Sequence, residues 1–152
     1  MGIFDGKVVI VTGGAYGIGR DTAYEFAREG ARVVVADIDV AAGKAVETRL
    51  KELGPGGLPI EADVSKSGAF RRVVSETVAD IGGVDVLFNH VSIQSPDSYF
   101  NVEDRPEEIW DQILGVNLKS YYLMSKYAIP EMRKRGGGAI VNTASVQGLQ
   151  SQ

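Results

Sequence analysis

The fold of this chain is decided by the stretch Thr12-Gly13-Gly14-Ala15-Tyr16-Gly17-Ile18-Gly19, which lies where a β-branched run gives way to a helical pattern. Glycine has three uses in such a turn. Gly13 permits the tight bend, Gly17 lets the backbone approach a pyrophosphate, and Gly19 lets the helix pack closely on the strand. The free N–H groups at the start of the helix would then face the anion. The stretch predicts a dinucleotide-binding turn, with an ordinary strand–helix turn as the alternative.

The strand after this turn ends in an acidic residue, Asp37, 18 positions after Gly19. A carboxylate at this point can accept hydrogen bonds from both ribose hydroxyls of NAD, and it would repel the 2′-phosphate of NADP. No arginine occupies position 16 or follows Asp37 directly, so the sequence favours NAD over NADP. The neighbouring Asp39 is more simply interpreted as a helix cap.

The rest of the chain alternates short apolar runs with helical patterns, which is typical of βαβ units and a parallel sheet. We therefore expect a single α/β domain over residues 1–152, a Rossmann-type doubly wound parallel sheet with strand order 3-2-1-4-5 that is incomplete at its C-terminal side. The expected strands cover residues 7–12, 32–36, 58–62, 84–89 and 139–143. The expected helices cover residues 17–29, 40–53, 67–81 and 106–135, the last broken near Gly115, with connections at 54–57 and 92–105.

Composition excludes several classes of function. A net charge of -4 and a pI near 5.0 leave no basic surface for nucleic acid, and the basic cluster 133–135 is expected to complement a helix dipole. The chain has no cysteine and one histidine, so we predict neither a disulfide nor a metal site. No apolar run approaches the roughly 20 residues of a membrane span, and no signal peptide is evident. We expect a cytoplasmic protein.

Taken with three motifs further on, the turn resembles that of the short-chain dehydrogenase/reductase family, whose form is T-G-x-x-x-G-I-G. Asp63 and Val64, after the third expected strand, match the family's adenine-binding pair. Asn117 matches its catalytic-site asparagine, and residues 140–145 match the strand that leads to its catalytic serine, here Ser145. The four motifs occur in the family's order, and the resemblance extends from residue 7 to residue 148.

The resemblance implies an NAD-dependent oxidoreductase that transfers a hydride between nicotinamide and a secondary alcohol or ketone. Ser145 would hydrogen-bond the substrate oxygen, and Asn117 would hold a water that links the site to solvent. A homo-oligomer is expected, because the long helix from Pro106 resembles the family's usual subunit contact. The expected cofactor contacts are Gly13, Tyr16, Gly17, Ile18, Gly19, Asp37, Ile38, Asp63, Val64, Asn89 and Val91.

The chain departs from the family after the fourth expected strand, where Asn-Asn-Ala-Gly is replaced by Asn89-His90-Val91-Ser92. Val91 and Ser92 are bulkier than alanine and glycine, so the cofactor would be displaced or bound more weakly. His90 has two interpretations, an acid/base group or a hydrogen-bonding structural residue, and the second is the commoner one for such a position.

The family's proton-transferring Tyr-x-x-x-Lys pair follows its serine, whereas the pair Tyr122 and Lys126 precedes Ser145. On a helix, Tyr122 and Lys126 also point away from Asn117, while Tyr121 shares its face. We therefore expect the pair to serve packing or subunit contact, and these 152 residues to lack the general acid/base. The expected sheet would have an unpaired edge, which predicts aggregation, pairing with another chain or disorder near residue 152.

Two other functions stay open on the same fold. One is a non-catalytic NAD-sensing module, which would have no need of a serine beside the substrate. The other is a methyltransferase that binds S-adenosylmethionine, a ligand without the pyrophosphate for which the glycine turn is suited.

Overall fold

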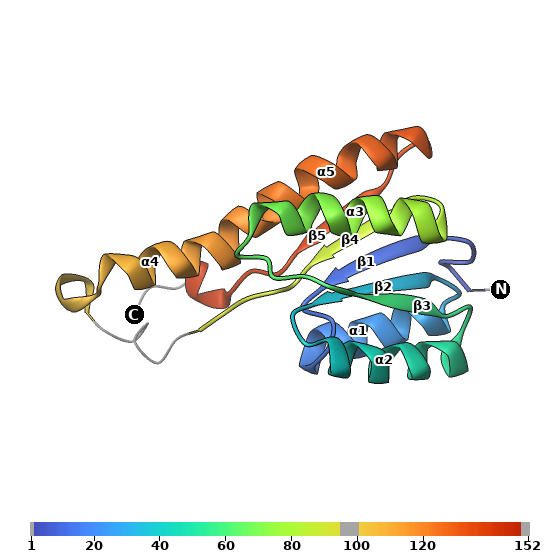
Figure 1. Cartoon of the computed structure of the whole chain (residues 1–152), viewed down its shortest axis with the longest axis horizontal. Helices are drawn as coiled ribbons and strands as arrows, with labels where there is room; N and C mark the ends of the chain where they lie inside the picture. Colours follow the sequence, from blue (N-terminus) through green and yellow to red (C-terminus); the bar gives the residue numbers. More distant parts are fainter. Residues whose placement is uncertain (1, 95–100, 150–152) are drawn as a thin grey trace.

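The computed structural model describes residues 2–94 and 101–149, so six residues of the expected irregular connection at 92–105 lie outside it. In the described part of the chain, five parallel strands form one sheet in the order β3-β2-β1-β4-β5, which confirms the predicted fold class and strand order (Figure 1). The strands are β1 Val8–Thr12, β2 Arg32–Asp37, β3 Gly57–Glu61, β4 Val86–Asn89 and β5 Ala139–Asn142.

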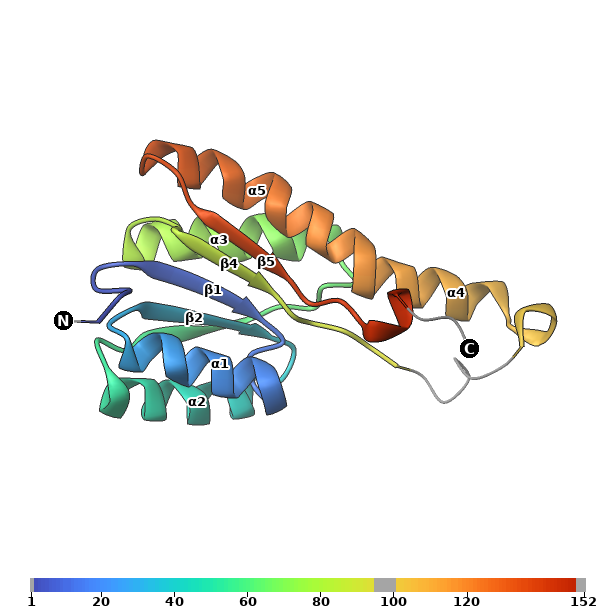
Figure 2. The ribbon, with the colours of Figure 1, turned by 180° about the vertical axis from the view of Figure 1, so that it is seen from behind.

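Helices cover the two faces of the sheet in pairs. On one face lie α1 (Gly17–Arg28) and α2 (Val40–Leu53), and on the other lie α3 (Ser67–Ile81) and α5 (Ser120–Lys134) (Figures 1 and 2). Because side chains alternate along a strand, successive residues of β1 and β2 supply two separate cores. One core contains Val9, Val11, Val33 and Val35 with α1 and α2, and the other contains Val8, Ile10, Val34 and Ala36 with α3 and α5.

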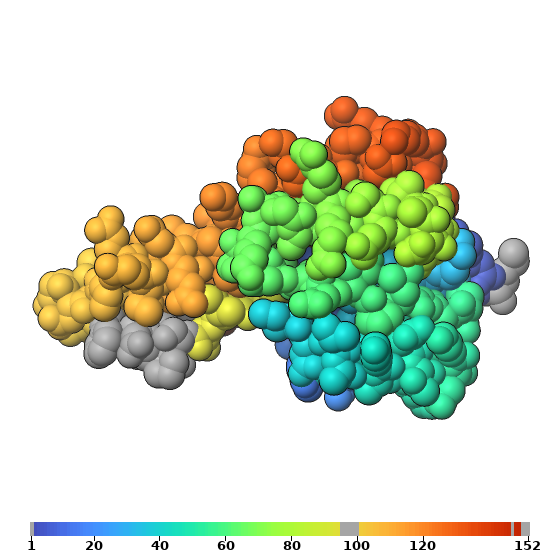
Figure 3. All heavy atoms as spheres, viewed as in Figure 1, coloured from blue at the N-terminus to red at the C-terminus, as the bar shows by residue number. Residues whose placement is uncertain are grey.

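The long helix expected from residue 106 is helical throughout but not uniform. It begins with α4 (Glu107–Leu114), continues through a π-helical turn at Gly115–Lys119, and runs into α5. The α-helix is therefore interrupted at Gly115, where a break was expected, but the interruption is a π-helical turn and not a loss of helical structure, since Gly115 keeps right-handed helical torsions, with φ −57° and ψ −45°. Figure 3 shows α4 standing out beyond the layered body.

Three strands begin away from the expected residues. β1 begins at Val8 rather than at residue 7. β3 starts at Gly57, one residue before the expected start. A methyl group on Gly57 would lie 1.8 Å from the Val33 carbonyl oxygen, so only glycine lets β3 pair so closely with β2. β4 starts at Val86 rather than at residue 84, and the side chain of Asp85, just before it, faces the start of β1.

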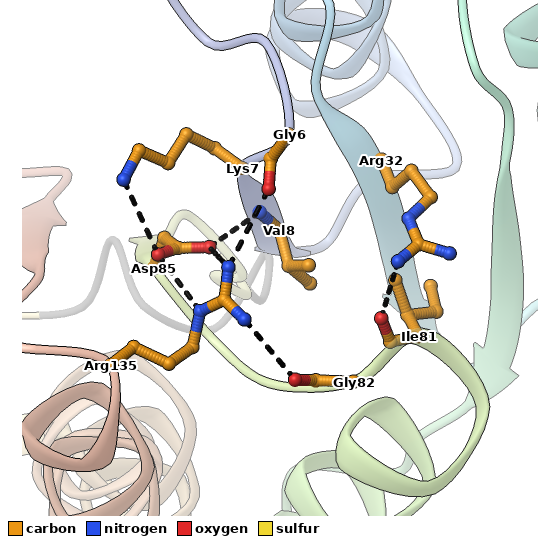
Figure 4. Close-up of polar contacts among 8 residues, drawn as sticks. All are labelled: Gly6, Lys7, Val8, Arg32, Ile81, Gly82, Asp85 and Arg135. Atoms are coloured by element: carbon orange, nitrogen blue, oxygen red, sulfur yellow. Dashed lines mark hydrogen bonds and ion pairs between the residues drawn. The ribbon is translucent and has the colours of Figure 1, made fainter.

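Asp85 joins the amino-terminal ends of the central strands to the end of α5 (Figure 4). Its buried carboxylate accepts a 2.8 Å hydrogen bond from the Val8 N–H and a 3.0 Å bond from Arg135 Nε, and Lys7 Nζ lies 3.7 Å away. Burial alone would raise the pKa of Asp85, but the Arg135 and Val8 hydrogen bonds and the two nearby cations outweigh it and lower that pKa. Arg135 thus has a specific partner, beyond the dipole role expected of residues 133–135.

β4 and β5 have a less covered face than the central strands. In Figure 2 no labelled helix of the described chain lies over them on the side of α1 and α2. Val141 in β5 is 49% exposed, and no described strand pairs with the outer edge of β5.

Candidate functional site

The glycine turn joins β1 to α1 with torsions that only glycine adopts easily. Gly13 has φ +68° and Gly17 has φ +50°. A methyl group on Gly17 would meet no described atom within 4 Å, so the space above this residue is open to a ligand. A methyl group on Gly19 would lie 2.1 Å from the Gly13 carbonyl oxygen, so the first turn of α1 packs directly on the bend.

The start of α1 has the properties of an anion site. Tyr16 is its N-cap residue and makes no capping hydrogen bond with its side chain, so the first N–H groups of the helix are left for another acceptor. The start of α2 differs, because Asp39 accepts a 2.9 Å hydrogen bond from the Ala42 N–H, as expected of a helix cap. Of these two neighbouring helix starts, the uncapped one follows the glycine turn.

Thr12 holds the ends of β1 and β4 together. Its buried hydroxyl accepts hydrogen bonds from the N–H groups of His90, at 3.0 Å, and Val91, at 3.3 Å. From the sequence, Thr12 has no predicted role beyond its place in the glycine motif. Its one sequence signal is a hydroxyl residue at the end of an otherwise apolar strand.

Asp37 lies at the carboxyl end of β2, beside the glycine turn. Its Oδ2 accepts a 3.0 Å hydrogen bond from the Ala15 N–H, and its Oδ1 accepts a 3.1 Å bond from the Asp39 N–H. Each carboxylate oxygen keeps a lone pair for a further donor. The side chain therefore fixes the turn and can still accept hydrogen bonds from a sugar.

Beside Asp37 a largely apolar cavity of about 110 Å³ opens at the ends of β2, β3 and β4. It brings together five of the expected cofactor residues, Asp37, Ile38, Asp63, Val64 and Val91, and its lining also includes Ala62, Ser65, Ile93 and Val116. An apolar slot beside a carboxylate suits an adenine ring, with the ribose next to the carboxylate. In Asp63, hydrogen bonds from the Ser65 side chain and backbone lower the pKa, so this carboxyl group is ionised at neutral pH.

A second, larger cavity of about 460 Å³ contains both expected catalytic residues, Asn117 and Ser145. Its other lining residues are Ser92, Ile93, Gln94, Arg105, Ile113, Tyr121, Thr143 and Ala144. Burial raises the pKa of Tyr121, against an opposing contribution from the Thr143 hydroxyl, so its phenol is neutral. The cavity offers hydroxyl and amide groups around a space of small-ligand size.

Asn117 is held by one residue of the connection after β4. Its Oδ1 accepts a 2.8 Å hydrogen bond from the Ile93 N–H, and its Nδ2 donates a 2.9 Å bond to the Ile93 carbonyl. Ile93 lines both cavities, so the amide positions the residue that lies between them. This contact with Ile93 differs from the role implied by the family resemblance, in which the amide holds a water.

His90 is engaged in contacts between strands. Its Nδ1 lies 2.9 Å from the Thr143 hydroxyl, and its ring stacks on Phe88 with 5.4 Å between centroids. Burial lowers the pKa of His90, which keeps the ring neutral at neutral pH. The adjacent Asn89 is fully buried and donates a 2.8 Å hydrogen bond to Asn142 Oδ1. These contacts favour the structural interpretation of His90.

The Tyr122 and Lys126 pair lies away from the Asn117 cavity, as the helical geometry predicted. Tyr122 is 63% exposed, and the Lys126 ammonium lies 5.9 Å from the centre of the Tyr127 ring. Tyr121 instead lines the cavity with Asn117.

Residues 2–94 and 101–149 contain no group of three or more acidic or histidine side chains placed to hold a metal ion. None of the helices within those ranges is both long and apolar enough to cross a membrane.

Comparison with known proteins gives one consistent set of relatives. The family model described as short chain dehydrogenase matches residues 7–152. An uncharacterised oxidoreductase of Thermotoga maritima is 42% identical over 150 residues, and momilactone A synthase of Oryza sativa subsp. japonica is 38% identical over 142 residues. The match covers 99% of this chain and 57% of the Thermotoga protein, and 93% of this chain and 50% of the rice protein.

Similar solved structures are also dehydrogenases. An NAD+-bound xylitol dehydrogenase superposes with a TM-score of 0.91 at 31% identity, covering 99% of this chain and 57% of that one. A 7α-hydroxysteroid dehydrogenase complexed with NADH and 7-oxo glycochenodeoxycholic acid gives 0.91 at 30%, covering 98% and 57%. The chain therefore spans a little over half the length of these relatives.

Proposed function

Because the chain belongs to the short-chain dehydrogenase family, we propose that it binds NAD at the carboxyl ends of β1, β2 and β4. We further propose that it serves an oxidoreductase acting on a secondary alcohol or ketone. The observation that carries the proposal is Asp37, whose carboxylate borders both the glycine turn and the apolar cavity. The uncapped start of α1 beside it suits the pyrophosphate. The two structural relatives described with NAD+ or NADH bound support the choice of a nicotinamide cofactor.

The residues of the larger cavity would act on the substrate. When bound, NAD supplies the hydride acceptor at its nicotinamide ring. The Ser145 hydroxyl would donate a hydrogen bond to the substrate oxygen and stabilise negative charge on it. Asn117, through Ile93, would fix the spacing between this cavity and the adenosine cavity. We place the general acid/base outside these 152 residues, since Tyr122 and Lys126 are turned away from Asn117 and Ser145.

Binding tests the cofactor proposal. The melting temperature of the chain should rise with NAD and rise less with NADP, because a ligand that binds only the folded state stabilises it by about 2.7 kcal/mol at one hundred times its Kd. S-adenosylmethionine should produce no shift. A shift with S-adenosylmethionine alone would support the methyltransferase alternative and overturn the proposal.

Turnover tests the catalytic proposal. We expect no NADH production from a panel of secondary alcohols with the 152 residues alone, and measurable production with the complete gene product. Robust turnover by the 152 residues would show that the base has been misassigned. Binding without turnover by the complete gene product would favour the NAD-sensing alternative.

We also propose that the protein is a homo-oligomer that pairs through α4 and the start of α5. Four large apolar side chains recur there every fourth residue and are exposed to solvent: Trp110 (51%), Leu114 (37%), Leu118 (62%) and Tyr122 (63%). An exposed row of this kind on one helix face is typical of a protein–protein contact.

A further inference from the structure

The side chain of Tyr16 bridges the starts of two helices. Tyr16 is the N-cap residue of α1, and its hydroxyl donates a 2.6 Å hydrogen bond to Oδ2 of Asp39, the N-cap residue of α2. The other oxygen of Asp39 accepts the Ala42 N–H at 2.9 Å. Both carboxylate oxygens of Asp39 therefore accept hydrogen bonds, and the Tyr16 side chain connects the start of α1 to the start of α2.

Both members of this contact keep their usual protonation states at neutral pH. Hydrogen bonds from the Ala42 N–H and the Tyr16 hydroxyl lower the pKa of Asp39, so its carboxyl group is ionised. The hydrogen bond to Asp39, slight burial and the charges of Asp39 and Asp37 raise the pKa of Tyr16. Tyr16 thus stays a donor, and its proton is committed to Asp39.

Asp39 lies beside the carboxylate expected to hold the ribose. The Asp39 N–H donates to Asp37 Oδ1 at 3.1 Å, and the two side chains line one small hollow at the start of α2. Lys44 and Glu61 also line that hollow and carry opposite charges. On α1, Arg20 is paired with Asp21 at 3.0 Å. The surface beside the expected ribose position therefore carries two negative charges, those of Asp37 and Asp39. The nearby cations Lys44 and Arg20 each have an acidic residue close by, so they do not cancel these two charges.

We propose that Asp39, held in place by Tyr16, is a second specificity residue that excludes the 2′-phosphate of NADP beside Asp37. The inference rests on the proposed cofactor site and extends it. A 2′-phosphate would carry an additional charge of about −1.5 to −2 into the field of two carboxylates. The Tyr16 hydroxyl, which could otherwise donate a hydrogen bond to the phosphate, is already used by Asp39. A 2′-hydroxyl carries no charge and tolerates the same rim.

Calorimetric titration with NAD and with NADP tests this role in matched variants. Asp39→Asn keeps a good helix cap and removes the charge, so we expect the NADP Kd to fall about fivefold and the NAD Kd to change less than about twofold. Glu52→Gln is the control. It removes the same charge from the far end of α2, about 20 Å along the helix and beyond the Debye length in 0.15 M salt, and both Kd values should stay unchanged.

Tyr16→Phe separates the hydrogen bond from the charge. Alone, it should lower the preference for NAD about twofold, because Asp39 loses a fixed position; in the Asp39→Asn background it should change nothing further. An unchanged NADP-to-NAD ratio of Kd values in Asp39→Asn, or a Tyr16→Phe effect that persists without the Asp39 charge, overturns the inference while leaving NAD binding intact. Failure of the unmodified chain to bind NAD overturns the cofactor site, and this inference with it.

Discussion

At the scale of single residues, Asp37 combines a structural and a binding role in one carboxylate. It accepts hydrogen bonds from the Ala15 and Asp39 N–H groups, which fixes the glycine turn against the start of α2. Asp37 also lines the apolar cavity beside which a ribose is expected. A substitution at Asp37 therefore changes the turn and the ligand contact together.

We expect Asp37→Asn to raise the Kd for NAD at least about tenfold. Hydrogen bonds to a charged acceptor contribute about 1.5–3 kcal/mol, and the amide offers a single oxygen in place of two. The Kd for NADP should rise less, because the same change removes repulsion of the phosphate. Calorimetry measures both constants, and Asp80→Asn, an exposed acid at the end of α3, is the control. Equal weakening of NAD and NADP would show that only the turn was disturbed.

A second prediction at this scale concerns Asp85 and the dependence of the free energy of unfolding on pH. Its pKa is lowered in the folded state from an ordinary 3.8. The resulting stabilisation is therefore complete above about pH 5 and is lost as the pH falls through the lowered value. Asp85→Asn should cost about 3 kcal/mol in the free energy of unfolding at pH 7, because it leaves Arg135 without its charged partner.

Urea unfolding at pH 7 and pH 3 checks this prediction. The parent chain should lose more stability between the two pH values than Asp85→Asn does. Glu52→Gln, which removes an exposed carboxylate 2.5 Å from Arg49, should change the free energy of unfolding at pH 7 by less than about 1 kcal/mol. Parallel pH profiles of the parent and Asp85→Asn would contradict the assignment.

At the scale of elements, the connection from β1 to α1 depends on close contact between backbones. Gly19→Ala places a methyl group 2.1 Å from the Gly13 carbonyl oxygen, a backbone atom that cannot move aside without shifting the turn. We expect a loss of about 2–3 kcal/mol in the free energy of unfolding and weaker NAD binding, measured by thermal melting and calorimetry.

Gly68→Ala provides the matched control for that substitution. Gly68 lies in the first turn of α3, where a methyl group meets no described atom within 4 Å. Alanine is also the better helix former, so the melting temperature should stay the same or rise. Similar losses in the two variants would mean that the close contact at Gly19 does not set the cost.

The local sequence pattern predicted the helices and strands well where intrinsic helix or strand propensity agrees with the packing on the sheet. α3 begins and ends at the expected residues, 67 and 81, because its apolar spacing matches the face that packs on the sheet. Gly115 could not be interpreted in the same way. It marks the start of a wider helical turn, directly after which the buried Ser120 hydroxyl donates a hydrogen bond back to the Val116 carbonyl. A π-helical turn of this kind has no single-residue signature.

In the candidate site, too, some features could be predicted from local sequence and others could not. Asp37, Asp63, Asn117 and Ser145 were predicted from motif positions, and the structure places them around two neighbouring cavities. The contacts made by Thr12, Ile93 and Arg135 could not be predicted, because each joins residues that lie more than 20 positions apart along the chain. Such contacts depend on which loops meet at the ends of the strands, and a single sequence does not record that.

At the scale of the whole molecule, the two halves of the sheet are covered unequally. β1 and β2 are packed on both faces, whereas β5 keeps three of its four residues exposed. α4 also stands out from the layers (Figure 3) and carries Trp110 and Leu114, the first two residues of the exposed row that continues through Leu118 to Tyr122. These are the surfaces where association with another chain would bury the most apolar area.

The last prediction concerns the oligomeric state and the exposed apolar row that runs from Trp110 to Tyr122. Leu118 is 62% exposed in the middle of the row, so Leu118→Glu would place a charge at the centre of the proposed contact, where desolvation makes it most costly. The dissociation constant of the oligomer, measured by sedimentation equilibrium, should rise at least about tenfold. Ile3→Glu, which alters an 80% exposed apolar residue near the N-terminus, should leave that constant unchanged. A parent chain that sediments as a monomer at every concentration, or equal effects of the two substitutions, would remove the basis for pairing through this helix.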